Sequence, residues 1–180
     1  MNSAELIVLM LLPLIGIGAM FFLLISRRTK NNEVHPAELS PQSRSLVRPL
    51  RESIESLEKL LKAHDDRTGI PVLGKQALET AKTLYNESLK YALVADQLRS
   101  SPAKSAEANR RADVILDRIQ DKVNEATNTI DELKLKFADS FVESVVPEND
   151  DNFDALISRL ENINNSYTEI DQTLNVRNNE

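Results

Sequence analysis

Apolar residues recur every three or four positions through most of this 180-residue chain, and this spacing is its strongest structural constraint. One segment shows it clearly, with Val47, Leu50, Ile54, Leu57 and Leu61 separated by steps of three and four. Such alternation forms one apolar stripe on an α-helix, and helices with narrow stripes pack side by side. The sequence shows no credible alternation of period two, which strands would require. The pattern therefore predicts an all-α fold.

Proline and glycine divide the region after residue 45 into separate helices. Proline is tolerated in the first turn of a helix and disrupts its interior, so Pro49, Pro102 and Pro147 indicate helix boundaries. The segment between Pro102 and Pro147 contains neither proline nor glycine, and it is predicted to be the longest helix. The predicted helices cover approximately residues 46–64, 72–99, 102–146 and 152–175.

The connections between these helices predict how they pack. The breaks at 65–71, 100–102 and 147–151 are short, so consecutive helices should run antiparallel. The third helix would be about 68 Å long at 1.5 Å per residue and should form the spine. We predict an elongated antiparallel bundle of about four helices with heptad-like seams over residues 45–177. Periodicity alone leaves open whether the seams pack within one chain or between chains.

An uncharged run of twenty residues, from Leu6 to Ile25, precedes this bundle. A helix of that length spans about 30 Å, which is the hydrocarbon thickness of a bilayer. No Lys or Arg precedes the run, and it exceeds the roughly 7–15 apolar residues of a cleaved signal peptide. We therefore predict that residues 1–26 form a single transmembrane helix that remains as an anchor. Residues 27–44, which include Pro36 and Pro41, are predicted to be a polar linker.

Basic residues on one side of the apolar run predict its orientation. Arg27, Arg28 and Lys30 follow the run directly, whereas Glu5 is the only charged side chain before it. Positive residues favour the cytoplasmic side of a membrane helix. The pattern predicts a single-pass membrane protein with its N-terminus outside and its C-terminal domain in the cytoplasm.

The charge of the chain is unevenly distributed along the sequence. Residues 27–51 contain six Lys or Arg and two Glu, a net charge of +4, whereas residues 137–180 contain two Arg and ten acidic residues, a net charge of −8. Cations near an anionic leaflet gain about 1 kcal/mol each, and acidic residues are repelled. We expect the bundle to project its acidic end away from the membrane.

The composition excludes several functional classes. The chain has no cysteine, which excludes disulfides, a thiolate nucleophile and a zinc–thiolate site. Two histidines are too few for a metal centre built from several histidines. A net acidic soluble part with few aromatic residues disfavours nucleic-acid binding. We therefore predict no catalytic residue, no cofactor, no metal and no nucleic-acid partner.

Two short motifs receive structural interpretations. Residues 69–76 match the GxxxxGK pattern of phosphate-binding loops, but they follow a predicted helix and have Gln76 where a hydroxyl residue is required. We interpret Pro71 and Gly74 as helix-start residues instead.

His64 lies on the first seam and is followed by two aspartates. We interpret it as a cap at a helix C-terminus, with a metal or proton-transfer role as the alternative.

Four carboxylates follow one another at intervals of four residues in the third predicted helix. They could form an acidic docking stripe for a basic helix or a divalent ion. The alternative is a solvated face, on which cations three residues earlier offset most of the repulsion. The four residues are Asp113, Asp117, Asp121 and Glu125.

We recognise no family in these residues, and the functional expectation depends on the predicted topology. We expect a membrane-tethered, non-enzymatic helical scaffold or interaction protein that displays a cytoplasmic bundle. It would contact membrane lipid through residues 6–25 and bind a protein partner or another copy of itself. The alternatives are a membrane-linked signal relay or regulator, and a small enzyme acting at the membrane.

Overall fold

The computed structural model separates the chain into two compact units, residues 1–33 and 34–180. The predicted transmembrane helix at 1–26 lies outside the residues that the structure describes. Among the helices of the described ranges, none is both long enough and apolar enough to cross a membrane. The described residues are 34–64, 70–100, 106–143, 151–167 and 170.

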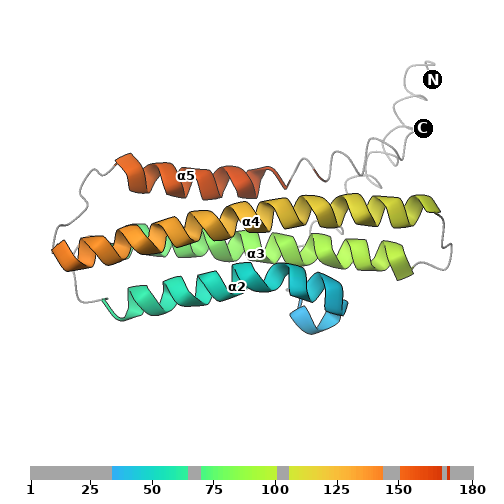
Figure 1. Cartoon of the computed structure of the whole chain (residues 1–180), viewed down its shortest axis with the longest axis horizontal. Helices are drawn as coiled ribbons and strands as arrows, with labels where there is room; N and C mark the ends of the chain where they lie inside the picture. Colours follow the sequence, from blue (N-terminus) through green and yellow to red (C-terminus); the bar gives the residue numbers. More distant parts are fainter. Residues whose placement is uncertain (1–33, 65–69, 101–105, 144–150, 168–169, 171–180) are drawn as a thin grey trace, which may run out of the picture. The chain divides into compact units, whose positions relative to one another are not determined.

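The described part of the chain is built from helices without a strand, so the predicted all-α class is confirmed. A short 3₁₀ helix, η1, precedes four α-helices, and consecutive α-helices run antiparallel (Figure 1). The elements are η1 (Pro36–Glu38), α2 (Pro41–Lys62), α3 (Ile70–Ser100), α4 (Ala106–Glu143) and α5 (Asp151–Asn165).

Helices α3 and α4 form the centre of the bundle. Helix α2 packs against both of them on one side and α5 packs against both on the other (Figure 1). Helix α4 has 38 residues, or about 57 Å, and is the longest helix of the described part, as predicted for the spine. Because all four helices contribute buried residues to one core, the seams pack within one chain.

The predicted seam of α4 is buried along its whole length. Helix α3 contributes fully buried alanines to the same core, including Ala77, Ala81 and Ala92. Small buried side chains of this kind allow neighbouring helices to pack closely. Phe137 of α4 contacts Phe153 of α5 with their ring centroids 4.8 Å apart. The buried seam residues of α4 are Ala112, Leu116, Ile119, Val123, Ala126, Ile130, Leu133 and Phe137.

Helix α2 begins at Pro41 instead of near residue 46, so the last part of the predicted linker at 27–44 belongs to the bundle. The Ser40 hydroxyl oxygen accepts a hydrogen bond from the Ser43 backbone N–H at 3.2 Å, which caps the helix. Asp96 of α3 accepts from the Ser40 backbone N–H at 2.7 Å and from the Ser43 hydroxyl at 2.8 Å. This contact with a distant helix fixes the earlier start, and Pro49 consequently lies inside α2.

Helix α5 ends at Asn165, where a turn at Ser166 and Tyr167 interrupts the predicted helix of 152–175. In this turn the backbone N–H of Tyr167 donates to the Asn164 carbonyl at 3.1 Å. Ile170 is helical again, and its backbone N–H donates to the Tyr167 carbonyl at 3.0 Å, whereas the predicted boundary near 175 lies outside the described residues. Tyr167 and Ile170 are nevertheless buried, as the seam predicted. The apolar spacing therefore persists beyond the end of the helix.

Gly74 is a contact between helices and does not mark a helix start. Helix α3 begins at Ile70, so Pro71 falls in its first turn, as interpreted, and Gly74 falls one turn inside. A Cβ at Gly74 would lie 2.6 Å from Cδ2 of Leu61 in α2. The missing side chain lets Leu61 rest against the α3 backbone.

Leu133→Ala is expected to lower the free energy of unfolding by about 2–5 kcal/mol, because it leaves a cavity in the core. Leu133 is 0% exposed, whereas Leu135 on the same helix is 68% exposed. Leu135→Ala is therefore the matched control, with an expected change within about 0.5 kcal/mol. Urea unfolding followed by circular dichroism measures both variants, and equal losses would contradict the described packing.

Candidate functional site

The outward-facing side of α4 carries the four acidic residues predicted as a docking stripe. All four are exposed. Two large apolar side chains continue the same face, because Leu135 lies about five turns beyond Asp117 and Val142 lies about two turns further. Leu135 is 68% exposed and Val142 is 84% exposed. We call this surface the α4 outer face, and it comprises Asp113, Asp117, Asp121, Glu125, Leu135 and Val142.

The four carboxylates differ in their contacts. Asp113 forms an ion pair with Arg99 of α3, and Glu125 accepts from Nε of Arg159 of α5 at 3.3 Å. These two residues therefore tie α4 to its neighbours. Asp117 and Asp121 form no ion pair with a described residue. The centre of the predicted stripe is thus open to a partner, while its two ends have structural contacts.

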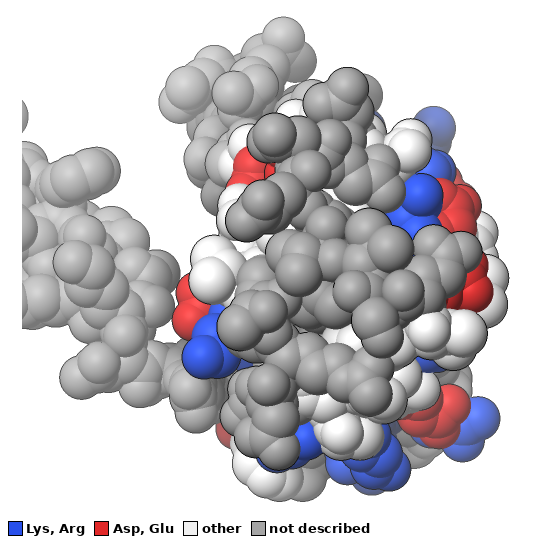
Figure 2. Space-filling model, turned by 90° about the vertical axis from the view of Figure 1, so that its left-hand side faces the viewer, with Lys and Arg blue, Asp and Glu red and all other residues white. Residues whose placement is uncertain are grey.

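The end of the bundle that includes Val142 shows mixed charge. It faces the viewer in Figure 2, where Lys and Arg lie beside Asp and Glu around the described rim. Four of the ten acidic residues counted over 137–180 belong to the segments 144–150 and 171–180, which lie outside the described residues. The basic flank formed by Arg27, Arg28 and Lys30 is also outside them.

His64 closes the C-terminal end of α2. Its Nδ1 lies 3.0 Å from the carbonyl oxygen of Leu60, which is the contact expected of a C-terminal cap. The imidazole also stacks on Phe141 of α4, with ring centroids 3.9 Å apart and planes 9° apart. Within the described ranges, no three His, Asp or Glu side chains gather into a metal-binding group. His64 therefore joins α2 to α4.

His35, which lies in the predicted linker, caps η1. Its Nδ1 accepts from the Ala37 backbone N–H at 3.2 Å, and its own backbone N–H donates to the Glu38 carboxylate at 3.1 Å. This is the reciprocal arrangement of a capping box. The three-residue spacing between His35 and Glu38 was the available signal, although Ser or Thr is the usual cap residue.

The GxxxxGK match forms no phosphate-binding loop. From Ile70 onward its backbone is helical and belongs to α3, so residues 70–76 form no extended glycine-rich loop. The Lys75 side chain is exposed, and the Gln76 amide donates to Glu161 of α5 at 3.4 Å. The hydrogen bond between Gln76 and Glu161 therefore joins α3 to α5 at the surface.

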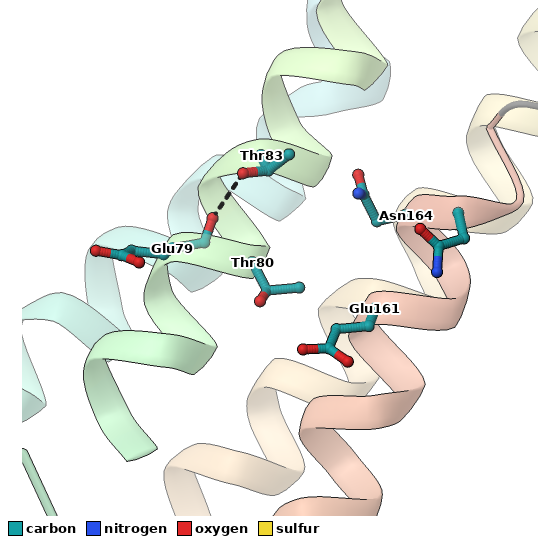
Figure 3. A pocket seen from close by; sticks show the side chains of 6 residues that line it. Glu79, Thr80, Thr83, Glu161 and Asn164 are labelled. Atoms are coloured by element: carbon teal, nitrogen blue, oxygen red, sulfur yellow. Dashed lines mark hydrogen bonds between the residues drawn. The ribbon is translucent and has the colours of Figure 1, made fainter. Parts of the chain in front are cut away.

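A polar groove of about 360 Å³ lies between α3 and α5 (Figure 3). Thr80 and Glu161 extend into the space between the two helices, whereas Glu79 points away from α5. The Thr83 hydroxyl donates to the Glu79 carbonyl of its own helix at 3.0 Å. Glu161 is the carboxylate that points into the groove, and the described lining contains no basic side chain. The groove therefore offers no acid–base pair. The lining residues are Glu79, Thr80, Thr83, Glu161, Asn164 and Asn165.

A buried hydrogen bond joins α3 to the segment after α5. Ser88 donates to the Leu84 carbonyl at 2.9 Å, and its hydroxyl oxygen lies 2.7 Å from the Tyr167 hydroxyl. Tyr167 stacks on Tyr91, with centroids 5.4 Å apart, and the Lys122 ammonium lies 5.3 Å from its ring centroid. Burial raises the pKa of Tyr167 to about 12, although the bond to Ser88 acts in the opposite direction. The phenol therefore stays neutral and donates to Ser88.

No family model, curated protein or solved structure matches this chain at a significant level. A functional proposal therefore depends on its own residues.

The natural chain is expected to lose more stability than Tyr167→Phe between pH 10 and pH 12. The neutral phenol is favoured in the folded state, because its pKa there is about 12 against an ordinary value of 10. Its contribution is complete below pH 10 and is lost as the pH rises through the folded pKa. The extra loss over this range should be about 2 kcal/mol.

Urea unfolding at a series of pH values measures this difference, and phenolate absorbance follows the titration itself. Because Tyr85, Tyr91 and the lysines are present in both proteins, their titration cancels in the comparison. Equal losses in the two proteins would contradict a buried, neutral Tyr167.

Proposed function

We propose that this protein is a membrane-tethered, non-enzymatic helical scaffold that displays its bundle in the cytoplasm. The observation that carries the proposal is the uncharged run from Leu6 to Ile25 followed at once by Arg27, Arg28 and Lys30. The run is long enough to span a bilayer, and the basic residues favour the cytoplasmic side. The bundle begins at Val34, soon after this flank.

The packing of the bundle supports a scaffolding role. Interhelical hydrogen bonds accompany the apolar core, including the bond from the Ser53 hydroxyl of α2 to Asp131 of α4 at 2.6 Å. Burial acts to raise the pKa of Asp131, but hydrogen bonds from Lys134 and Ser53 outweigh it and lower this pKa. Asp131 therefore remains an acceptor at neutral pH. Contacts of this kind hold the helices in one register and keep their outer surfaces fixed.

The α4 outer face is the surface on which we place partner binding. Leu135 and Val142 offer two apolar contacts on one side of a helix, and Asp117 and Asp121 offer negative charge along the same side. An amphipathic helix with basic residues beside its apolar stripe complements such a surface. The partner is a protein of this chemistry or a second copy of the chain.

A cysteine-labelling experiment tests the anchor and its orientation. The chain contains no cysteine, so single substitutions give unique labels. On intact cells an impermeant maleimide should label Ser3→Cys and should fail to label Ser158→Cys until the cells are opened. Ser158 is exposed in α5, which makes its reactivity independent of folding. Labelling of Ser158→Cys on intact cells would contradict the orientation, and extraction of the protein by alkaline carbonate would contradict the anchor.

Site-specific photocrosslinking tests the α4 outer face. A photoreactive amino acid at Leu135 or Val142 of the full chain, expressed in its membrane, should yield a discrete adduct of higher mass. The same group at Asn86, which is exposed on α3, is the control and should yield none. Leu135→Glu with the photoreactive group at Val142 should reduce the adduct at least about tenfold, as expected for an interface contact worth more than 1 kcal/mol. Equal adducts at all three positions would contradict a dedicated surface.

A further inference from the structure

A second groove, of about 330 Å³, lies where the bundle begins. Residues of η1, the first turns of α2 and one side chain of α3 line it, and we call it the arginine groove. Its lining combines two prolines and a tyrosine with one arginine on each of three successive turns of α2. The residues that define it are Pro36, Pro41, Arg44, Arg48, Arg51 and Tyr85.

The three arginines are exposed, and each has one hydrogen bond or ion pair with a described residue. Arg44 donates through Nη2 to the Leu39 carbonyl at 3.0 Å, which directs its side chain along η1. Arg48 and Arg51 use Nε toward Glu52 and Glu55, at 3.4 and 2.7 Å. A guanidinium has five N–H donors, so each keeps terminal donors for another acceptor. Exposed pairs of this type contribute little to stability and exchange readily for a stronger acceptor.

The charges along α2 are ordered by distance from the predicted anchor. Arg44 and Arg48 occupy its first turns, Arg51 follows, and the acidic residues Glu52 and Glu55 come after them. Glu33 and Glu38 precede the groove in sequence. The first three turns of α2 therefore carry arginine without a carboxylate, whereas glutamates and lysines occur farther along the helix.

The length of the connection limits how far the groove can lie from the membrane. Residues 26–33 separate Ile25 from Val34. Eight extended residues reach at most about 28 Å. If residues 1–26 are the anchor, Val34 lies within that distance of the end of the anchor, and η1 begins two residues later.

We propose that the arginine groove binds the headgroup phosphate of an anionic phospholipid in the leaflet next to the bundle. This inference rests on the proposed membrane anchor. The planar guanidinium matches phosphate oxygens with two parallel hydrogen bonds, which suits three arginines in one groove. The Pro36, Pro41 and Tyr85 carbons accept the less polar part of the lipid near its glycerol. Binding there orients the bundle with the start of α2 on the membrane and Val142 away from it.

A fluorescence experiment on the full chain tests this inference. The protein is reconstituted in phosphatidylcholine vesicles that contain a nitroxide-headgroup lipid as quencher, with phosphatidylglycerol added stepwise. A fluorophore on Ala37→Cys in η1 should be quenched increasingly as phosphatidylglycerol is added. The same fluorophore on Ser158→Cys in α5 should not respond.

The combined substitution Arg44→Gln, Arg48→Gln and Arg51→Gln should raise the phosphatidylglycerol fraction needed for half-maximal quenching more than about tenfold, since each lost arginine contact removes roughly a fivefold preference. Lys59→Gln, Lys62→Gln and Lys82→Gln remove the same charge farther along the bundle and should leave the response unchanged. Quenching that does not change as phosphatidylglycerol is added would overturn the inference. An equal loss of quenching in both triple variants would overturn it too.

Flotation of the same vesicles in high salt separates this inference from the proposed anchor. A protein that floats with the vesicles and shows no dependence on phosphatidylglycerol keeps its anchor and loses the lipid site. A protein that fails to float overturns both proposals. Circular dichroism of each variant confirms that the substitutions leave the helices intact, because all six residues are solvent-facing.

Discussion

The burial of one long apolar stripe against α3 is the interaction on which the rest of this structure depends. Helix α4 contributes large buried side chains such as Ile119, Leu133 and Phe137 to the core, and α3 contributes fully buried alanines. Large side chains opposite small ones let two long helices lie close together without voids. The outer helices α2 and α5 then complete the core from opposite sides.

Polar contacts decide the register in which these stripes meet. An apolar seam with a regular repeat can slip by a turn at modest cost, whereas a buried polar group that loses its partner costs roughly 1–3 kcal/mol. Asp96 receives both a backbone and a side-chain hydrogen bond from the start of α2. Ser88 and Tyr167 make a comparable contact on the other side of the bundle. Helix α2 and the segment that follows α5 are therefore held by separate polar contacts on the same central helix, α3.

The sequence was sufficient for the helices and their seams, because apolar spacing and proline positions are local signals. It missed the start of α2, since Ser40 is fixed by Asp96, a residue far away in the chain. It also missed the turn at Ser166 and Tyr167 that interrupts the predicted fourth helix, because no proline or glycine marks this turn. The acidic residues of α4 were predicted, but the exposure of Leu135 and Val142 was not, because their position off the seam becomes meaningful only once the neighbours of α4 are known.

The arrangement of α2 and α5 on opposite sides of the central pair has a consequence for how the bundle loosens. Within the described residues these two helices share no extensive interface, so each depends on α3 and α4 and not on the other. With 15 residues against 22, α5 is the shorter of the two and has fewer turns to hold it. Partial opening can therefore begin on the α5 side while the half of the fold that contains η1 and α2 keeps its packing.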